Sequence, residues 1–141
     1  MDPKFNIPSK DATHLLRGLV AVNEAQLRRR IAAGTLKDPF FITRAIQDGR
    51  LKYKRADPSE HWQTWEELYR SVNNDKLSGT IAGGADCEDL AAAVVAELKL
   101  AGIPARTYVY KAKPKLFHVV VLTNRWGFLD PSRDAGMAGN G

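Results

Sequence analysis

Cysteine is almost missing from this sequence, which has one, Cys87, among 141 residues. A single cysteine cannot form an internal disulfide, so we expect a reducing compartment, most simply the cytoplasm of the producing cell. One cysteine and three scattered histidines also lack the ligand spacing of a zinc site. His14 and His61 fall on expected helix surfaces, and we expect both to be structural or solvated.

Long apolar runs are missing as well. No stretch approaches the roughly 20 apolar residues that cross a bilayer. The first residues, Met1 to Phe5, lack a basic region followed by an apolar run. We therefore expect neither a membrane span nor a secretory signal peptide. With 44% hydrophobic and 26% charged residues, the composition is that of an ordinary soluble domain with one core.

Dense blocks of one charge are absent, although the formal net charge is +5. The basic residues are spread along the chain, and no long basic block with interleaved aromatic residues occurs. A solvated basic surface is therefore favoured over a dedicated nucleic-acid interface. Binding of nucleic acid stays open as a further hypothesis, and it requires strongly salt-dependent binding.

Helical spacing of apolar residues dominates the first two thirds of the chain, and strand-like runs dominate the last third. Helices followed by strands predict an α+β fold, with helices packed on an antiparallel sheet of about three strands. Gly18 could divide the first helix in two. The expected helices span 11–33, 40–47, 60–71 and 87–102, and the expected strands 106–110, 117–122 and 126–129, with 51–54 a strand or extended loop.

Cys87 stands where a nucleophile would stand, between a glycine pair and an apolar helix. Asp86 can cap that helix, with Asp89 three residues on as in a capping box. The positive helix end favours the reactive thiolate, and the Cys87 N–H is a donor that can hold an oxyanion. Asp86, Glu88 and Asp89 oppose ionisation by their charge, so a cationic partner is required. A buried structural thiol is the alternative.

His118 is the candidate partner, in an apolar run where an imidazole needs a hydrogen bond. Asp130 follows 12 residues later, across one turn, on the neighbouring expected strand. Adjacent strands lie about 4.8 Å apart, so Asp130 can reach the ring and fix its tautomer. Cysteine, histidine and aspartate in this order predict thiol-based acyl transfer, although each taken singly is more often structural.

Four separate blocks of the sequence resemble, block by block, the motifs of one known protein family. They are the nucleophile string 84–91 with its continuation 100–106, the preceding segment 62–68, the histidine strand 117–119 and the aspartate strand 128–131. In this order they resemble the transglutaminase-like cysteine peptidases of the papain-like superfamily. The resemblance covers about residues 60–132. The short stand-alone form is similar to proteins of phage and prophage genomes, a branch of the bacterial family.

The resemblance implies a papain-like core, in which the nucleophile helix packs on a small antiparallel sheet. It implies a catalytic core within one domain, preceded by a helical lead-in. The glycine-rich end of the chain predicts a short flexible tail. The domain would span 1–134, with a helical lead-in at 1–59 and the core at 60–132, and the flexible tail 135–141.

Site residues follow from the same resemblance. It implies Cys87 as the nucleophile, His118 as general base and then acid, and Asp130 as the residue that orients the imidazole. Gln63 or Trp62 would supply the second oxyanion donor, by analogy with an upstream polar or aromatic residue. Packing of the helix is the alternative for both.

The same resemblance raises calcium binding as an alternative, because some bacterial members of that family bind calcium beside the nucleophile. Asp86, Glu88 and Asp89 match the Asp-Cys-Glu-Asp pattern of those relatives, and carboxylate oxygens suit Ca²⁺. Capping explains Asp86 and Asp89 equally well. We therefore expect no required cofactor, with calcium as the alternative.

The sequence thus predicts a thiol-dependent hydrolase of peptide or amide bonds that works through an acyl-enzyme. Transglutaminase-type acyl transfer or deamidation is the second interpretation, because the same triad serves both. A non-catalytic phage accessory or virion-assembly module of the same fold is the alternative outside enzymes. The expected partners are a protein or peptide substrate, or phage structural proteins, in the host cytoplasm if the protein is phage-encoded. The short segment 111–116 predicts a shallow pocket.

Overall fold

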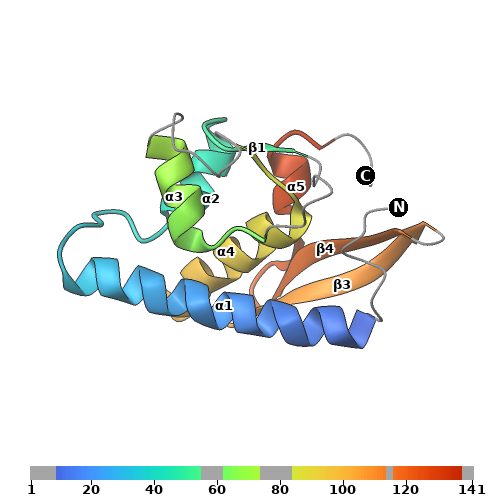
Figure 1. Ribbon diagram of the computed structural model, residues 1–141. Coiled ribbons are helices and arrows are strands. Elements are labelled where there is room, and N and C mark those ends of the chain that lie inside the picture. Colours follow the sequence, from blue (N-terminus) through green and yellow to red (C-terminus); the bar gives the residue numbers. More distant parts are fainter. Residues whose placement is uncertain (1–8, 55–61, 74–83, 114–115, 138–141) are drawn as a thin grey trace.

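The computed structural model describes residues 9–54, 62–73, 84–113 and 116–137. These residues form an α+β fold, with α1 along one side, α4 in the middle and a three-stranded antiparallel sheet beside them (Figure 1). None of the described helices has the length and apolar character needed to cross a membrane. The helices are α1 (Ser9–Ala32), α2 (Phe41–Gln47), α3 (Trp65–Asn73), α4 (Cys87–Leu100) and α5 (Pro131–Asp134). The strands are β1 (Lys52–Tyr53), β2 (Gly84–Ala85), β3 (Ala105–Lys113), β4 (Leu116–Thr123) and β5 (Gly127–Leu129).

The longest helix, α1, runs without interruption through Gly18, where the sequence allowed a break. It begins at Ser9, two residues before the expected cap Asp11. Leu16 and Leu27 are fully buried in the core that α1 shares with α4. Because tertiary packing supplies most of a helix's stability, this buried face holds α1 together across the glycine.

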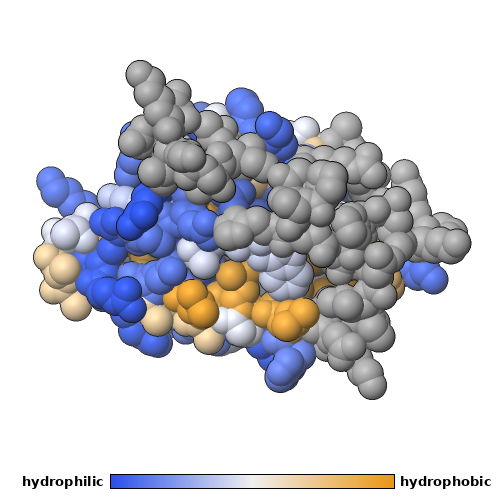
Figure 2. Space-filling view, viewed as in Figure 1, coloured by the Kyte–Doolittle hydropathy of each residue, from blue (hydrophilic) through white to orange (hydrophobic). Residues whose placement is uncertain are grey.

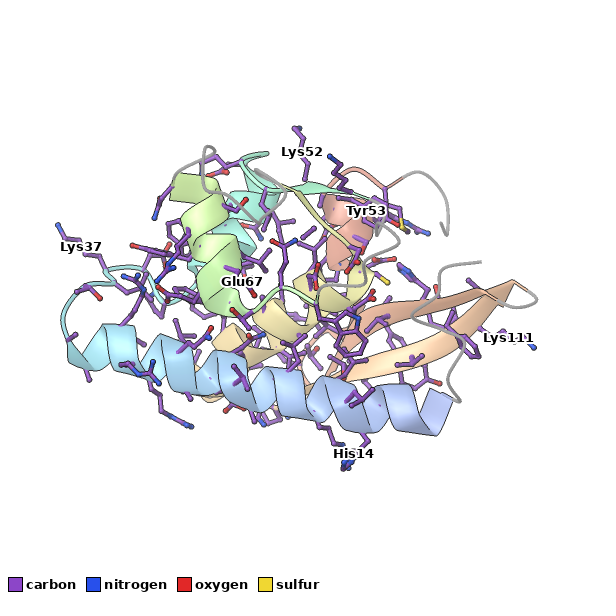
Figure 3. All side chains as sticks on the ribbon, in the orientation of Figure 1. His14, Lys37, Lys52, Tyr53, Glu67 and Lys111 are labelled. Carbon is purple, nitrogen blue, oxygen red and sulfur yellow. The ribbon has the colours of Figure 1, made fainter. Side chains whose placement is uncertain are left out.

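The outer face of α1 carries both polar and apolar side chains. Leu15 and Val22 are 51% and 46% exposed, and apolar side chains gather along α1 in Figure 2. His14 extends into solvent from the same helix, as the sequence predicts (Figure 3). The other histidine expected on a helix surface, His61, lies outside the described residues.

The central helix, α4, is buried on all sides. Every residue from Cys87 to Leu98 is buried, and α1, α2, α3, α5 and the sheet all contact this helix. The helix ends at Leu100, and Gly102 follows with a φ of 82°, a left-handed conformation that glycine adopts freely. The helix stop predicted from this glycine is confirmed.

The sheet has the strand order β3-β4-β5, with antiparallel pairs throughout. Val119 and Val121 of β4 are fully buried in the core with α4. Since side chains alternate along a strand, His118 and Val120 belong to the opposite face. On that face Tyr110 stands directly opposite His118 in the register. The sheet therefore packs on α4 through Val119 and Val121, and Tyr110 is the cross-strand neighbour of His118.

The turn between β4 and β5 lies one residue later than predicted. Thr123 belongs to β4, where its hydroxyl donates to the Gly127 carbonyl at 2.9 Å. The same hydroxyl accepts the Trp126 N–H at 2.8 Å. These two bonds keep Thr123 in the strand, so residues 124–126 form the turn.

Helix α3 begins later than the predicted residue 60. Residues 62–64 are not helical, and 55–61 lie outside the described part of the chain. Two side chains of α1 accept free N–H groups at the start of the helix. Asn23 Oδ1 accepts the Trp65 N–H at 2.7 Å, and Gln26 Oε1 accepts the Glu66 N–H at 2.8 Å. The start of α3 is also marked locally by a capping box, because the Thr64 hydroxyl accepts the Glu67 N–H at 3.3 Å and the Glu67 carboxylate accepts the Thr64 N–H at 3.0 Å.

Three short elements, β1, β2 and α5, complete the described fold. Strands β1 and β2 form a short parallel pair, and α5 follows the sheet directly. The segment from residue 135 was expected to be a flexible tail because of its glycines. However, Ala135 and Met137 are buried, and the Ala135 carbonyl accepts the Tyr53 N–H at 2.9 Å. The beginning of that segment therefore belongs to the packed structure.

Candidate active site

The start of α4 is fixed by a reciprocal capping box, as the sequence predicts. The Asp86 carboxylate accepts the Asp89 N–H at 3.3 Å, and the Asp89 carboxylate accepts the Asp86 N–H at 3.3 Å. Both carboxylates are buried and satisfy donors that a helix start leaves open. The box makes Cys87 the first residue of α4.

The thiol of Cys87 is buried beside an acidic neighbour. Its Sγ donates to Glu88 Oε2 at 3.1 Å, and the residue is only 7% exposed. Glu88 itself is fully buried. The opposition of negative neighbours that the sequence suggests is therefore a direct contact. Ionisation of the thiol requires that its proton pass to another base.

His118 and Asp130 form the contact expected from the sequence. The imidazole Nε2 lies 3.1 Å and 3.0 Å from the two carboxylate oxygens of Asp130. Because a carboxylate accepts hydrogen bonds, Nε2 carries the proton, and Nδ1 of the neutral ring keeps its lone pair. The ring is 2% exposed, so its tautomer is set by this contact.

Asp130 is held in the ionised form. Burial opposes ionisation, but the hydrogen bond and charge of His118, with the Arg133 N–H and guanidinium, outweigh it and lower the pKa of Asp130. The carboxylate also caps α5, because it accepts the Arg133 N–H at 3.3 Å. A short helix that the sequence did not predict thus fixes the carboxylate beside the imidazole.

Tyr110 is a site residue that the sequence analysis missed. Its ring meets the His118 ring edge to face, with centroids 5.7 Å apart. Burial and the charge of Asp130 raise the pKa of the Tyr110 hydroxyl, Arg133 opposes them, and an ionised Cys87 adds to the increase. The hydroxyl therefore lies within the electrostatic field of both Asp130 and Cys87. Only the strand register, which places Tyr110 opposite His118, could have identified it.

The two expected oxyanion residues lie near the start of α4. The Gln63 backbone N–H donates to Asp89 Oδ1 at 2.8 Å, and its side-chain amide donates to Oδ2 at 3.4 Å. Trp62 is half-buried against the core. These contacts agree with the alternative interpretation, in which Gln63 and Trp62 serve the packing of the helix. An oxyanion role for either residue stays a prediction.

The three acidic residues around Cys87 do not fit a shared calcium site in this arrangement. Asp86 and Asp89 accept backbone N–H groups, and Glu88 accepts the thiol. Over the described ranges no three potential ligands come together around one point. Ca²⁺ needs six to eight oxygens at one point, so we derive no chemistry from calcium.

A groove lies next to the His118–Asp130 pair, on the sheet face away from α4. Its volume is about 570 Å³, and it is open to solvent. Asp130 contributes to its wall, so the groove reaches the charged end of the pair. The lining also includes Tyr108, Tyr110, Val120, Phe128 and Arg133.

Comparison with known proteins adds no assignment. No family model matches the chain, and neither a curated protein nor a solved structure matches it. The function is therefore argued from the chemistry of the site alone.

Proposed function

We propose that this chain is a thiol-dependent hydrolase of peptide or amide bonds, with a papain-like core of the transglutaminase-like kind. The pairing of His118 Nε2 with Asp130 carries the proposal, because it leaves Nδ1 as a base. The proposed nucleophile is the thiol of Cys87, at the start of α4. In the structure its Sγ contacts Glu88, so the reaction requires that the thiol turn from Glu88 toward His118 Nδ1.

The reaction has two half-reactions, and in each of them His118 acts first as a base and then as an acid. His118 Nδ1 takes the proton of the Cys87 thiol, and Sγ attacks the carbonyl carbon, forming a C–S bond. The backbone N–H of Cys87 stabilises the oxyanion of the tetrahedral intermediate. His118 then gives its proton to the departing nitrogen as the C–N bond breaks. Water repeats the sequence in reverse on the acyl-enzyme and releases a carboxylic acid.

Asp130 and Tyr110 position the imidazole. The Asp130 carboxylate stabilises the imidazolium that forms when His118 takes the proton. The Tyr110 ring supports the imidazole edge to face and limits its rotation. Because its pKa is raised, the Tyr110 hydroxyl stays protonated.

Acyl transfer is the alternative outcome of the same chemistry. If an amine enters in place of water, the acyl-enzyme becomes an amide. With a glutamine side chain as acyl donor, an amine gives transglutamination and water gives deamidation. The triad serves all these reactions. Access of the acceptor to the acyl-enzyme decides between them.

A non-catalytic binding module is the second candidate function. The contact between the Cys87 thiol and Glu88 favours it, because a buried thiol bonded to a carboxylate is a poor nucleophile. In that case the His118–Asp130 pair serves the packing of the sheet. Phage structural proteins are the partners proposed for such a module.

Alkylation of Cys87 by iodoacetamide under native conditions tests the proposal. We expect the wild type to react, Cys87→Ala to remain unlabelled, and His118→Ala to react at least about tenfold more slowly at pH 7. His14→Ala is the matched control, since His14 is exposed on α1. Equal rates in the wild type and in both histidine variants would refute the proposal.

The pH profile of the same reaction separates the two candidates. A midpoint well below about 8.5, moving up in His118→Ala, supports a working pair of thiol and imidazole. A midpoint near about 8.5 in both proteins supports the binding module. Release of p-nitrophenol from p-nitrophenyl acetate, with a burst that depends on Cys87, then measures acyl-enzyme formation.

A further inference from the structure

The groove beside the catalytic pair is built from a continuous series of aromatic rings. Phe128 meets Tyr108 edge to face at 5.1 Å between centroids, and Tyr108 lies 6.5 Å from Tyr110. Tyr110 in turn contacts His118 at 5.7 Å. A side chain of a bound ligand that enters the groove therefore contacts aromatic rings, the last of which, Tyr110, contacts the His118 imidazole.

The ring at the rim of the groove is open to solvent. Phe128 is 60% exposed, whereas Val120 below it is 5% exposed. Covering such a ring with an apolar group removes surface from water, and aromatic pairs add to this gain. Trp126, in the neighbouring turn, is 52% exposed but does not line the groove.

Positive charge borders the same groove. Arg133 is part of the lining, and the Arg106 guanidinium lies 5.5 Å from the centre of the Tyr108 ring. Among the residues that the structure describes, Arg106 has no ion pair. A guanidinium at the edge of an apolar groove suits a carboxylate on the ligand.

The position of the groove indicates which half of a substrate it holds. In the described part of the chain its lining includes Asp130 and Tyr110 and not Cys87. The departing nitrogen must lie beside His118, which protonates it. Whatever is attached to that nitrogen extends past the imidazole toward Tyr110.

We infer that the groove binds the amine side of the substrate, a peptide segment whose first side chain is aromatic and whose second is acidic. This inference rests on the proposed function. The aromatic side chain packs on Tyr108 and Phe128, and the acidic one pairs with Arg106. In hydrolysis this segment is the leaving group, and in transfer it is the acceptor.

The experiment uses the dipeptide amides Phe-Glu-NH₂ and Gly-Glu-NH₂ as acceptors. p-Nitrophenyl acetate acetylates Cys87 and releases p-nitrophenol. The dipeptide's amine then attacks the thioester carbonyl, an N–C bond forms and the C–S bond breaks. His118 carries the amine proton to the sulfur. The two acetylated dipeptides are quantified at equal acceptor concentrations, and a free acetyl thioester gives the intrinsic ratio of the two amines.

We expect the wild type to favour Phe-Glu-NH₂ about tenfold or more over the intrinsic ratio, which corresponds to burial of one aromatic side chain. Phe128→Ala should bring the preference to within about twofold of the intrinsic ratio, and Trp126→Ala should retain the wild-type preference. A wild-type ratio equal to the intrinsic one would overturn the inference.

A binding measurement separates failure of the groove from failure of the proposed function. Phe-Glu-NH₂ is titrated into Cys87→Ala, and the ring signals of Tyr108 and Phe128 are followed by NMR. Saturable shifts that disappear in the double variant Cys87→Ala/Phe128→Ala support the groove, even if Cys87 is never acetylated and the proposed function fails. Absence of shifts overturns the groove, whatever the thiol does.

Discussion

Glu97 provides a test of the structure that does not depend on the proposed function. It lies in α4, is fully buried, and accepts four hydrogen bonds. The donors are Ile42 N–H at 2.8 Å, Thr43 N–H at 2.9 Å, Thr43 Oγ1 at 2.7 Å and Trp65 Nε1 at 2.9 Å. One carboxylate therefore caps α2 and connects α3 to α4.

The protonation of Glu97 makes stability depend on pH. Burial raises its pKa from 4.5 to about 7, although the four hydrogen bonds oppose the increase. Between these values the folded protein holds a proton that the unfolded chain has lost. The contribution of Glu97 to stability is thus fully present below about pH 4.5 and is lost as the pH rises through about 7. The shift corresponds to about 3 kcal/mol in total, most of which falls between pH 5 and pH 8.

The assay is urea unfolding followed by tryptophan fluorescence at pH 5 and pH 8, in the wild type and in Glu97→Gln. Glutamine cannot ionise, so subtracting its pH dependence removes that of the other groups, which is additive for distant sites. The wild type should lose about 2–3 kcal/mol more than the variant over this interval. The variant is less stable at both pH values, because its NH₂ faces the donors of α2.

A second variant tests the direction of the effect. Thr43→Val removes one donor that favours the ionised carboxylate, so the pH dependence should become steeper than in the wild type. Identical pH dependence in the wild type and Glu97→Gln would refute the reasoning. It would mean that the carboxylate titrates in the folded protein as it does in the unfolded chain.

The remaining predictions concern the core, the cap and the site. Leu68→Ala, at a fully buried residue, should cost about 2–5 kcal/mol in urea unfolding, whereas Leu15→Ala, at a residue 51% exposed, should change stability by less than about 0.5 kcal/mol. Asp86→Ala should cost about 1 kcal/mol, with Asp86→Asn retaining most of the cap; equal losses would argue against the capping box. Asp130→Asn still caps α5 but can present an NH₂ group to His118, so turnover of p-nitrophenyl acetate should fall roughly 10²-fold with an unchanged circular dichroism spectrum.

The sequence predicted those features that depend on neighbouring residues. The end of α4 follows from Gly102, and the capping box follows from Asp86 and Asp89. The contact between His118 and Asp130 was also predictable, because one turn separates two adjacent strands. In each case the signal and the structure lie within a few residues or one hairpin.

Features set by distant segments were not predictable in this way. Asn23 of α1 accepts the Trp65 N–H, a contact that the local Thr64–Glu67 capping box does not reveal. Tyr110 joins the site only through the strand register. Glu97 looks like the polar residue of an otherwise apolar helix, which suggests a solvated face. It is buried because α2 and the Trp65 indole supply donors from elsewhere in the chain. Single-sequence patterns contain no record of such partners.

Helix α4 links the stability prediction to the test of function, since Glu97 and Cys87 lie near its two ends. A thiol that is 7% exposed reacts either as a thiolate in the folded state or after local opening of the structure. A loss of about 2–3 kcal/mol between pH 5 and pH 8 raises the open population on the order of 10²-fold, so alkylation would increase with pH even for an inert thiol. His118→Ala affects the thiolate route, and Glu97→Gln affects the pH dependence of opening. A pH profile that follows His118 and ignores Glu97 therefore belongs to the catalytic pair, and the reverse pattern belongs to the fold.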